Sequence, residues 1–517
     1  MELCCLHLGN WPTSFLLGLA VCLLLLYIYG KQPYGFWERL GVPGPKPSMF
    51  LGNIPDVYSP ETAKVVYARW QAKYGRTYGM YYFRKPSLVT TDPEIIRQVL
   101  IKDFANFRDR FSHDDDALIN PQLDSGIFFA KGETWKRIRG LISPSFSIAK
   151  IKSMTSVINN SATRLGQHVL ESARKGVPLD AKLLFGAFAM DVVTGTGFGI
   201  DVDSMKNLDE PFTRHGRSLF IYKKSVKIVS LLGCSFPTIA RPIARLLNSG
   251  FFKTEDMEFF NASIRQMIKE RRREKTETKR VDFLQLLIDV MDGAPGDADR
   301  SGQLNEDEIV AQGIMLFIAG YETASSTLQF LSYELTKHPE VLDKLVAEIE
   351  SVIGDEEPSY EACQNLKYTE AVLNETLRMY PPLSVISRQN ETATVLNGIN
   401  LPPKTGVSIP LYLLGRDPEF WENPDTFNPD RFVEENNTST FNPLAFIPFG
   451  SGPRICVGMK VGLLEMKLAL IQVLRRVVFT KAVPEKLHIE DFTAILQPSQ
   501  RIMIYASPRT TVWTAHE

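Results

Sequence analysis

Residues 449–458 read Phe-Gly-Ser-Gly-Pro-Arg-Ile-Cys-Val-Gly, and this stretch says more about the fold than any other. Its one cysteine, Cys456, is followed by an apolar-periodic run from Met459 to Val478 that predicts a helix. A thiolate at a helix N-terminus is stabilised by the helix dipole and by free backbone N–H groups. The glycines before Cys456 allow the backbone to approach a large, flat group closely.

These features predict a loop that binds the proximal face of a haem, with the sulfur of Cys456 as axial ligand. Arg454, two residues earlier, suits an anionic group such as a haem propionate. A phosphate-binding loop would need Gly-Lys-Ser/Thr, but Lys460 is followed by Val461. A zinc site would need further cysteine or histidine ligands nearby, and the sequence has none there. A buried structural cysteine in a glycine-rich turn is the remaining alternative.

The pattern Phe-x-x-Gly-x-Arg-x-Cys-x-Gly resembles the haem-binding motif of the cytochrome P-450 haem-thiolate monooxygenases. The resemblance covers essentially the whole chain. It is closest to the microsomal, drug- and steroid-metabolising animal branch that includes thromboxane synthase, through the phrases at 135–137, 143–146 and 449–454. It implies a mainly α cytochrome P-450 fold, with a large helical lobe and a small β-rich lobe. It also implies haem b with a cysteine thiolate axial ligand, held by a loop that includes Phe449 and Arg454.

The whole chain has 517 residues, of which 44% are hydrophobic, and a formal net charge of −1. This length supports one large core or two lobes, and the composition does not indicate disorder. The near-zero charge argues against nucleic acid as a partner. Three of the six cysteines lie in the apolar N-terminus and the others are far apart in the sequence. We therefore expect no disulfide framework and a reducing compartment.

An uncharged apolar run, Trp11–Tyr29, precedes the globular part of the chain. With its flanks it is long enough to cross a hydrocarbon core of roughly 30 Å. A cleaved signal peptide, the alternative, favours basic residues before the run, whereas Glu2 precedes this one. Lys31 and Arg39 place positive charge after it. We predict an uncleaved single-pass anchor in the endoplasmic reticulum membrane, with the catalytic part in the cytosol.

A proline-rich segment, Val42–Pro47, follows the anchor. Prolines stiffen the backbone and stop helices, so the segment predicts a rigid spacer. It resembles the hinge that follows the anchor in microsomal members of the family. The chain is therefore predicted to divide into an anchor at residues 1–30, a hinge at 31–48 and a catalytic domain at 49–517.

The globular part is predicted to be mostly helical, with a small β region at one side. Helical patterns occupy Glu61–Tyr74, Thr134–Ile142, Ile148–Arg174, Phe212–Val229, Lys253–Thr278, Asp282–Met291, Glu306–Thr336, Glu340–Ile353 and Leu366–Met379. Strand patterns occupy Thr77–Phe83, Ser87–Thr91, Val385–Gln389, Thr394–Leu396, Gly406–Ile409 and Arg501–Ala506.

The long helix pattern at Glu306–Thr336 contains Ala-Gly-Tyr-Glu-Thr at 319–323. Glycine inside a helix costs about 1 kcal/mol relative to alanine, so Gly320 indicates either a bulky ligand near the backbone or a tight helix crossing. An acid beside a hydroxyl can relay protons. The segment resembles the family's central helix over the distal haem face. The resemblance implies that Thr323 holds water and dioxygen and that Glu322 feeds protons.

Further residues receive roles from the resemblance alone. Trp135, Arg139 and Arg388 are expected to reach the haem propionates together with Arg454, and either Arg108 or Arg110 is a further candidate. Glu375 and Arg378, at i and i+3 on one helix, are expected to form a structural network with Arg431. The substrate is expected to contact apolar residues of several segments: Phe128, Phe129, Met315, Ile318, Ala319, Val385, Ile386 and Leu496.

The sequence thus predicts a membrane-bound haem-thiolate monooxygenase that inserts one oxygen atom from O2 into an apolar substrate such as a steroid, lipid or xenobiotic. The expected electron donor is NADPH–cytochrome reductase, with cytochrome b5 as a further partner. Six basic residues are expected to form the docking face: Lys131, Lys136, Arg137, Lys150, Lys460 and Lys467. One alternative is a haem-thiolate isomerase acting on a lipid peroxide, which needs no proton relay. Another is a non-enzymatic haem sensor or carrier.

Overall fold

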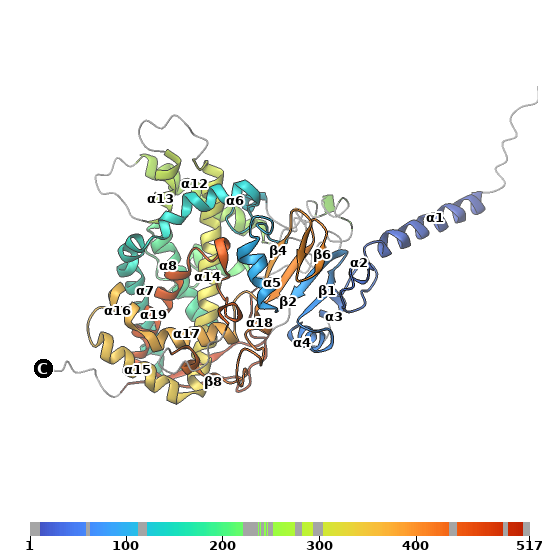
Figure 1. Cartoon of the computed structure of the whole chain (residues 1–517). Coiled ribbons are helices and arrows are strands. Elements are labelled where there is room, and N and C mark those ends of the chain that lie inside the picture. The colour runs from blue at the N-terminus through green and yellow to red at the C-terminus, as the bar shows by residue number, and fades with distance from the viewer. Residues whose placement is uncertain are drawn as a thin grey trace, which may run out of the picture.

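The structure is a computed structural model of the whole chain (Figure 1). It describes residues 11–57, 63–111, 121–220, 252–273, 282–292, 303–433, 442–489 and 495–509, together with residues 236, 238, 242, 243 and 246. The distal part of the predicted helix Phe212–Val229, beyond residue 220, lies outside the described residues.

Helices make up most of the described chain, and most of the helices gather in one large lobe (Figure 1). In chain order they are α1 (Trp11–Lys31), α2 (Phe36–Arg39), α3 (Ile54–Val57), α4 (Ala63–Tyr74), α5 (Pro93–Arg97), α6 (Gly132–Ile142), α7 (Ile148–Lys175), α8 (Ala181–Phe198), α9 (Pro211–Leu219), α12 (Thr254–Arg273), α13 (Phe283–Asp292), α14 (Glu306–Lys337), α15 (Pro339–Ile353), α16 (Tyr360–Asn365), α17 (Lys367–Met379), α18 (Leu411–Leu414) and α19 (Met459–Leu474). The longest of them within the globular part, α14, runs through the middle of this lobe.

Within the described residues, the strands form three small sheets. They are β1 (Thr77–Tyr82), β2 (Lys85–Thr90), β3 (Leu179–Asp180), β4 (Val385–Gln389), β5 (Thr394–Leu396), β6 (Ile399–Leu401), β7 (Gly406–Pro410), β8 (Val477–Val483) and β9 (Met503–Pro508). The largest sheet has the order β1-β2-β7-β4, in which β2 and β7 are parallel and the other pairs are antiparallel. This sheet lies beside the helical lobe, as the sequence predicts (Figure 1).

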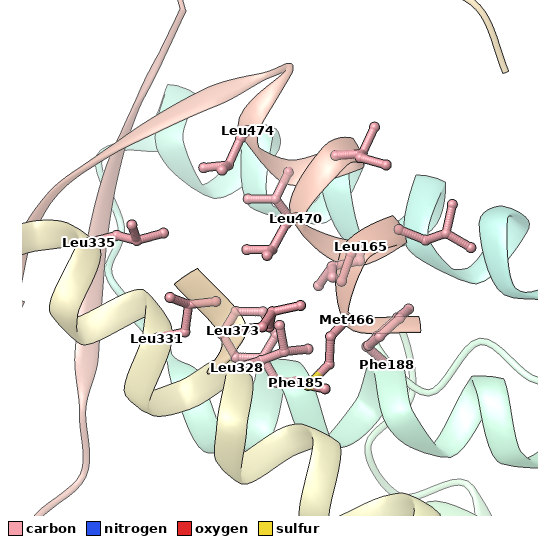
Figure 2. Packing of buried hydrophobic residues seen from close by; sticks show 14 of the residues in the cluster. Leu165, Phe185, Phe188, Leu328, Leu331, Leu335, Leu373, Met466, Leu470 and Leu474 are labelled. Atoms are coloured by element: carbon pink, nitrogen blue, oxygen red, sulfur yellow. The ribbon is translucent and has the colours of Figure 1, made fainter. Parts of the chain in front are cut away.

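One hydrophobic cluster holds the central helices together. Figure 2 shows apolar side chains from α7, α8, α14, α17 and α19 meeting in it. Leu328 on α14 and Leu470 on α19 are both fully or nearly fully buried. Protein interiors are packed as densely as organic crystals, so helices that share such a cluster keep a fixed relative position. The cluster therefore fixes α14 relative to α19 and to the loop 449–458, which contains Cys456 and leads directly into α19.

Among the elements that differ from the prediction, two belong to the core. Helix α8 was missed because almost all of its residues are buried, and a helix that is apolar on every side shows no amphipathic period. The apolar run Met459–Val478 is not one helix, since α19 ends at Leu474 and β8 begins at Val477. The two consecutive valines of β8 are β-branched residues that favour strands, but they continue the hydrophobic pattern of the helix.

The predicted anchor forms α1, which extends away from the globular part (Figure 1). Among the described residues, α1 and α8 are both long and apolar enough to span a membrane, but α8 is a core helix. The end of α1 contacts the globule through Arg84. Its Cζ lies 3.5 Å from the centroid of the Tyr29 ring, and its Nη2 donates to the Tyr29 carbonyl at 2.9 Å. Within the predicted hinge, Trp37 is buried and its Nε1 donates to the Met80 carbonyl at 2.9 Å. The three-part division of the chain stays a prediction.

Candidate active site

The loop before α19 bends sharply around Cys456. Gly450 and Gly452 have φ of 80° and 71°, in the left-handed region that favours glycine. A Cβ on Gly452 would lie 1.9 Å from the carbonyl oxygen of Leu100, so no larger residue fits there. The Cys456 backbone N–H donates to the carbonyl of Phe449 at 2.9 Å and closes the turn. The sequence therefore folds here into a tight loop that presents one thiol.

The Cys456 thiol is partly accessible and yet closely surrounded by protein. Burial raises the pKa of the Cys456 thiol, and backbone N–H groups of Gly458 and Met459, together with Arg139 and Arg110, act in the opposite direction. These donors lie at the start of α19, where the helix dipole favours an anion. The loop thus favours an electron-rich sulfur once a bound metal displaces the thiol proton to solvent.

Ala319 is exposed in the middle of α14, although Ile318 and Tyr321 beside it are buried. Thr323, one turn further, is half-buried, and its Oγ1 donates to the Ala319 carbonyl at 2.7 Å. Within the buried central helix, accessible surface is therefore found at Ala319 and Thr323, two of the four positions predicted to face the ligand, whereas Met315 and Ile318 are buried.

Three arginines from different segments meet near this loop. The Nε atoms of Arg110, Arg388 and Arg454 are buried without a hydrogen-bond partner, as is Nη1 of Arg454. Burial and the neighbouring Arg110 lower the pKa of Arg454 to about 9. Burial likewise lowers the pKa of Arg110 to about 10 and, with repulsion from Arg110 and Arg454, lowers the pKa of Arg388. Asp109 faces one of them, with Oδ1 3.6 Å from Arg454 Nη2.

This cluster has more buried cationic donors than acceptors. Buried cations are normally paired with anions, because an unpaired buried charge carries a large desolvation cost. A ligand that brings two carboxylates would satisfy the orphaned Nε and Nη1 atoms, and guanidinium groups bind carboxylates with particularly favourable geometry. Together with the accessible thiol of Cys456, the residues present therefore fit haem b and its two propionates.

The other predicted propionate residues lie around the cluster. The guanidinium of Arg454 lies 4.4 Å from the ring of the buried Trp135, and Arg454 Nη2 donates to the Ala130 carbonyl at 2.8 Å. Arg139 lies near Cys456, and burial lowers the pKa of its guanidinium. Of the two residues left open by the sequence, Arg110 joins the cluster, whereas Arg108 binds Glu133 at the surface at 2.5 Å.

Glu322 and Thr323 are adjacent in sequence but their side chains bond in different directions. The carboxylate of Glu322 is fully buried, and its Oε1 accepts from Lys182 Nζ at 2.5 Å and from Gln497 Nε2 at 2.6 Å. Its Oε2 is buried without a partner. Sequence patterns missed Lys182 and Gln497, since they lie 140 and 175 positions from Glu322 and belong to no local motif.

Gly320 is explained by a helix crossing. A Cβ at this position would lie 2.5 Å from Cγ2 of Val193 on α8. On the facing helix, a Cβ on Gly186 would lie 2.8 Å from the Tyr321 hydroxyl. Small residues on both helices let α8 and α14 pack closely, so the structure supports the alternative of a tight helix crossing at Gly320.

The predicted Glu–Arg–Arg network is present in the structure. Arg378 Nε and Nη2 donate to the two carboxylate oxygens of Glu375 at 2.7 and 2.8 Å, and both side chains are completely buried. Arg431 Nε lies 3.4 Å from Glu375 Oε1. Arg378 also donates to the carbonyl of Pro424 at 2.8 Å. The network ties α17 to the segment that leads into the loop, which is a structural role.

The predicted docking face is corrected in one residue. Lys467 is buried and its Nζ donates to the Cys363 carbonyl at 2.9 Å and to Glu370 at 2.8 Å. Arg137 is half-buried and pairs with Glu308. The remaining four lysines are exposed or half-buried at the surface: Lys131, Lys136, Lys150 and Lys460. Two of these six residues, Lys136 and Arg137, belong to the lining of a surface hollow on α6. The other lining residues are Glu133, Thr134, Gly140 and Leu141.

The predicted substrate contacts come from separate apolar clusters. Met315 and Ile318 on α14 belong to one cluster, against which Phe128 and Phe129 pack. Ile386 approaches the Cys456 loop, since a Cβ on Gly450 would lie 3.8 Å from its Cδ1. Apolar side chains of α14 therefore lie next to the exposed Ala319, and an apolar side chain of β4 lies next to the Cys456 loop.

Comparison with known proteins matches a family model described as cytochrome P450 to residues 42–506. Cytochrome P450 3A28 of Bos taurus is 36% identical over 502 residues, which cover 95% of this chain and 95% of the relative. Cytochrome P450 3A29 of Sus scrofa is 37% identical over 97% of this chain and 98% of its own. Cytochrome P450 3A5 of Homo sapiens is 36% identical over the same two shares.

These matches extend over nearly the whole chain and confirm the resemblance drawn from its motifs, including the mainly helical fold. They give no support to the sensor or isomerase alternatives. The chain therefore belongs to the cytochrome P450 family, as a haem-thiolate monooxygenase that carries haem b with a cysteine thiolate as axial ligand.

Proposed function

We propose that Cys456 supplies the axial thiolate and that Arg454, Arg388 and Arg110 bind the haem propionates. The observation that carries this proposal is the group of buried guanidinium donors without acceptors, in the same region as the one accessible thiol among the described residues of the catalytic part. Trp135 supports the Arg454 guanidinium by stacking, and Arg139 adds positive charge next to the sulfur. Phe449 holds the turn through its carbonyl.

When bound, the haem uses two electrons to activate O2 and inserts one oxygen atom into a C–H bond of the substrate. Around it, Thr323 holds water and dioxygen through a hydroxyl that otherwise closes onto the Ala319 carbonyl. Glu322 delivers the protons that this reaction consumes. Apolar residues of α14, including Met315 and Ile318, exclude water and favour an apolar substrate such as a steroid, lipid or xenobiotic.

The proposed electron donor is NADPH–cytochrome P450 reductase, with cytochrome b5 as a second partner. Lys131, Lys136 and Lys460 are exposed and suit an acidic partner surface, and the hollow on α6 gives this surface a concave shape. Helix α1 would hold the protein in the endoplasmic reticulum membrane with the catalytic part in the cytosol, because the basic Lys31 follows its apolar segment.

Turnover with purified reductase tests this proposal. The protein and reductase are combined in vesicles with an apolar substrate that shifts the haem optical spectrum, and NADPH and product are measured together. We expect product to form only when NADPH is consumed. An isomerase would instead convert a lipid peroxide without NADPH, and this result would replace the monooxygenase proposal.

A further inference from the structure

The carboxylate of Glu322 is held in place by two side chains from outside its own helix. Lys182 lies in the first turn of α8, and its Nζ is 2.5 Å from Glu322 Oε1. Gln497 lies in the segment before β9 and donates to the same oxygen at 2.6 Å. Both partners therefore bind one carboxylate oxygen, and Oε2 is left buried without a partner.

Independent contacts position these two partners. The backbone N–H of Lys182 donates to the N-cap residue Asp180 at 3.0 Å, which fixes the start of α8. The segment that carries Gln497 is bound to α14, since Ser326 Oγ donates to the carbonyl of Leu496 at 3.0 Å. Neither placement depends on the Glu322 carboxylate, so the two donors form a prebuilt holder for it.

Lys182 also connects the buried acid to the surface. Its side chain is 26% exposed, whereas the side chain of Glu322 is completely buried. The ammonium group can exchange protons with bulk water while it donates to Glu322 Oε1. Oε2 accepts from neither Lys182 nor Gln497, so it is the carboxylate oxygen that remains available for another partner.

We propose that Lys182 and Gln497 are positioning residues for oxygen activation, which hold Glu322 through Oε1 and leave Oε2 to carry the proton. This inference rests on the proposed role of Glu322. The overall reaction converts substrate, O2, two electrons and two protons into hydroxylated product and water. If the protons are not delivered on time, O2 instead leaves with the two electrons and two protons as hydrogen peroxide, and product per NADPH falls.

The test compares two oxidants in the full-length, haem-loaded protein. With NADPH and reductase, the reaction needs proton delivery. With added hydrogen peroxide it does not, because peroxide already carries both electrons and both protons. We expect Lys182→Met to lower product per NADPH about 10- to 100-fold, as loss of a supporting residue commonly does, and to raise peroxide release. Product formed from added peroxide should stay within about twofold of the wild type. This change is clearly smaller than the about 10-fold or larger loss expected with NADPH.

Matched variants separate positioning from other causes. Lys182→Arg keeps the cation and should recover most of the coupling, and Gln497→Leu should resemble Lys182→Met. In a Glu322→Gln background, Lys182→Met should cause no further loss, since it acts through Glu322. Lys206→Met removes a lysine that is 82% exposed and paired with Asp203, and it should change nothing.

Thermal unfolding provides a measurement that is independent of turnover. Lys182→Met and Glu322→Gln should each lower the midpoint, and the double variant should lower it by less than the sum. Unchanged product per NADPH in Lys182→Met, or equal losses with both oxidants, would overturn the inference. If the wild type forms product with neither oxidant, the proposed function itself fails.

Discussion

Arg454→Met gives the sharpest test of the arginine cluster. Burial and the neighbouring Arg110 lower the pKa of Arg454 to about 9, which corresponds to about 5 kcal/mol of unfavourable energy for its cation. Bound carboxylates would repay this cost. Removing the cation therefore stabilises the haem-free protein and destabilises the haem-bound protein. Both effects reduce haem affinity.

The size of the loss follows from the bonds available to Arg454. Its Nε and Nη1 are the free donors, and a hydrogen bond to a charged group contributes about 1.5–3 kcal/mol. Arg388 and Arg110 remain in the variant and hold part of the carboxylate charge, so the net loss should be about that of one such bond, roughly 1.5–3 kcal/mol. We therefore expect haem to leave Arg454→Met about 10- to 150-fold faster than the wild type, as measured by transfer to an excess of a haem-free acceptor protein.

Two variants serve as controls for this measurement. Arg454→Lys keeps the charge but loses the planar fork, so its rate should lie between those of the wild type and Arg454→Met. Arg108→Met removes a neighbouring arginine that pairs with the exposed Glu133, and it should change the rate less than about fivefold, since surface pairs contribute ~0–1 kcal/mol. If Arg454→Met and Arg108→Met release haem at the wild-type rate, the cluster does not bind the propionates.

Two further predictions concern stability. Glu375→Gln should destabilise the protein by about 3–5 kcal/mol, because it leaves Arg378 buried without its anion. Lys344→Met, at the partly exposed pair with Asp430, should cost less than about 1 kcal/mol. Equal urea midpoints for the two variants would refute the prediction that the buried pair contributes more. Burial raises the pKa of Glu465 to about 8, so its neutral form favours folding at low pH and this contribution is lost as pH rises through about 8. Glu465→Gln should therefore raise the melting temperature more at pH 8.5 than at pH 6, and a gain that does not depend on pH would contradict this.

Much of the site could be predicted because its residues sit in local patterns. Cys456 and Arg454 belong to one short loop, and Glu322 and Thr323 are neighbours on a helix with a clear start at the capping residue Asn305. Strand β4, which carries Arg388, was predicted with the bounds that it has in the structure. Such features depend on spacing along the chain, which a sequence displays directly.

The remaining features depend on contacts between distant segments. The bonds from Lys182 and Gln497 to Glu322 have no local pattern. Lys467 was predicted to lie at the surface because lysine usually does, but its side chain is buried and pairs with the partly exposed Glu370. Helix α8 has no polar face to mark it. In each case a partner far away in the sequence decides the placement of the residue.

The central claim is that Cys456 supplies the sulfur ligand of the haem iron. The direct measurement is the absorption spectrum of the reduced carbon monoxide complex, for the wild type and for Cys456→Ser, with haem content determined in parallel. We predict that the wild type absorbs at the long wavelength typical of thiolate ligation and that Cys456→Ser loses this band. A Cys456→Ser protein that retains both haem and an unchanged thiolate band would contradict the account.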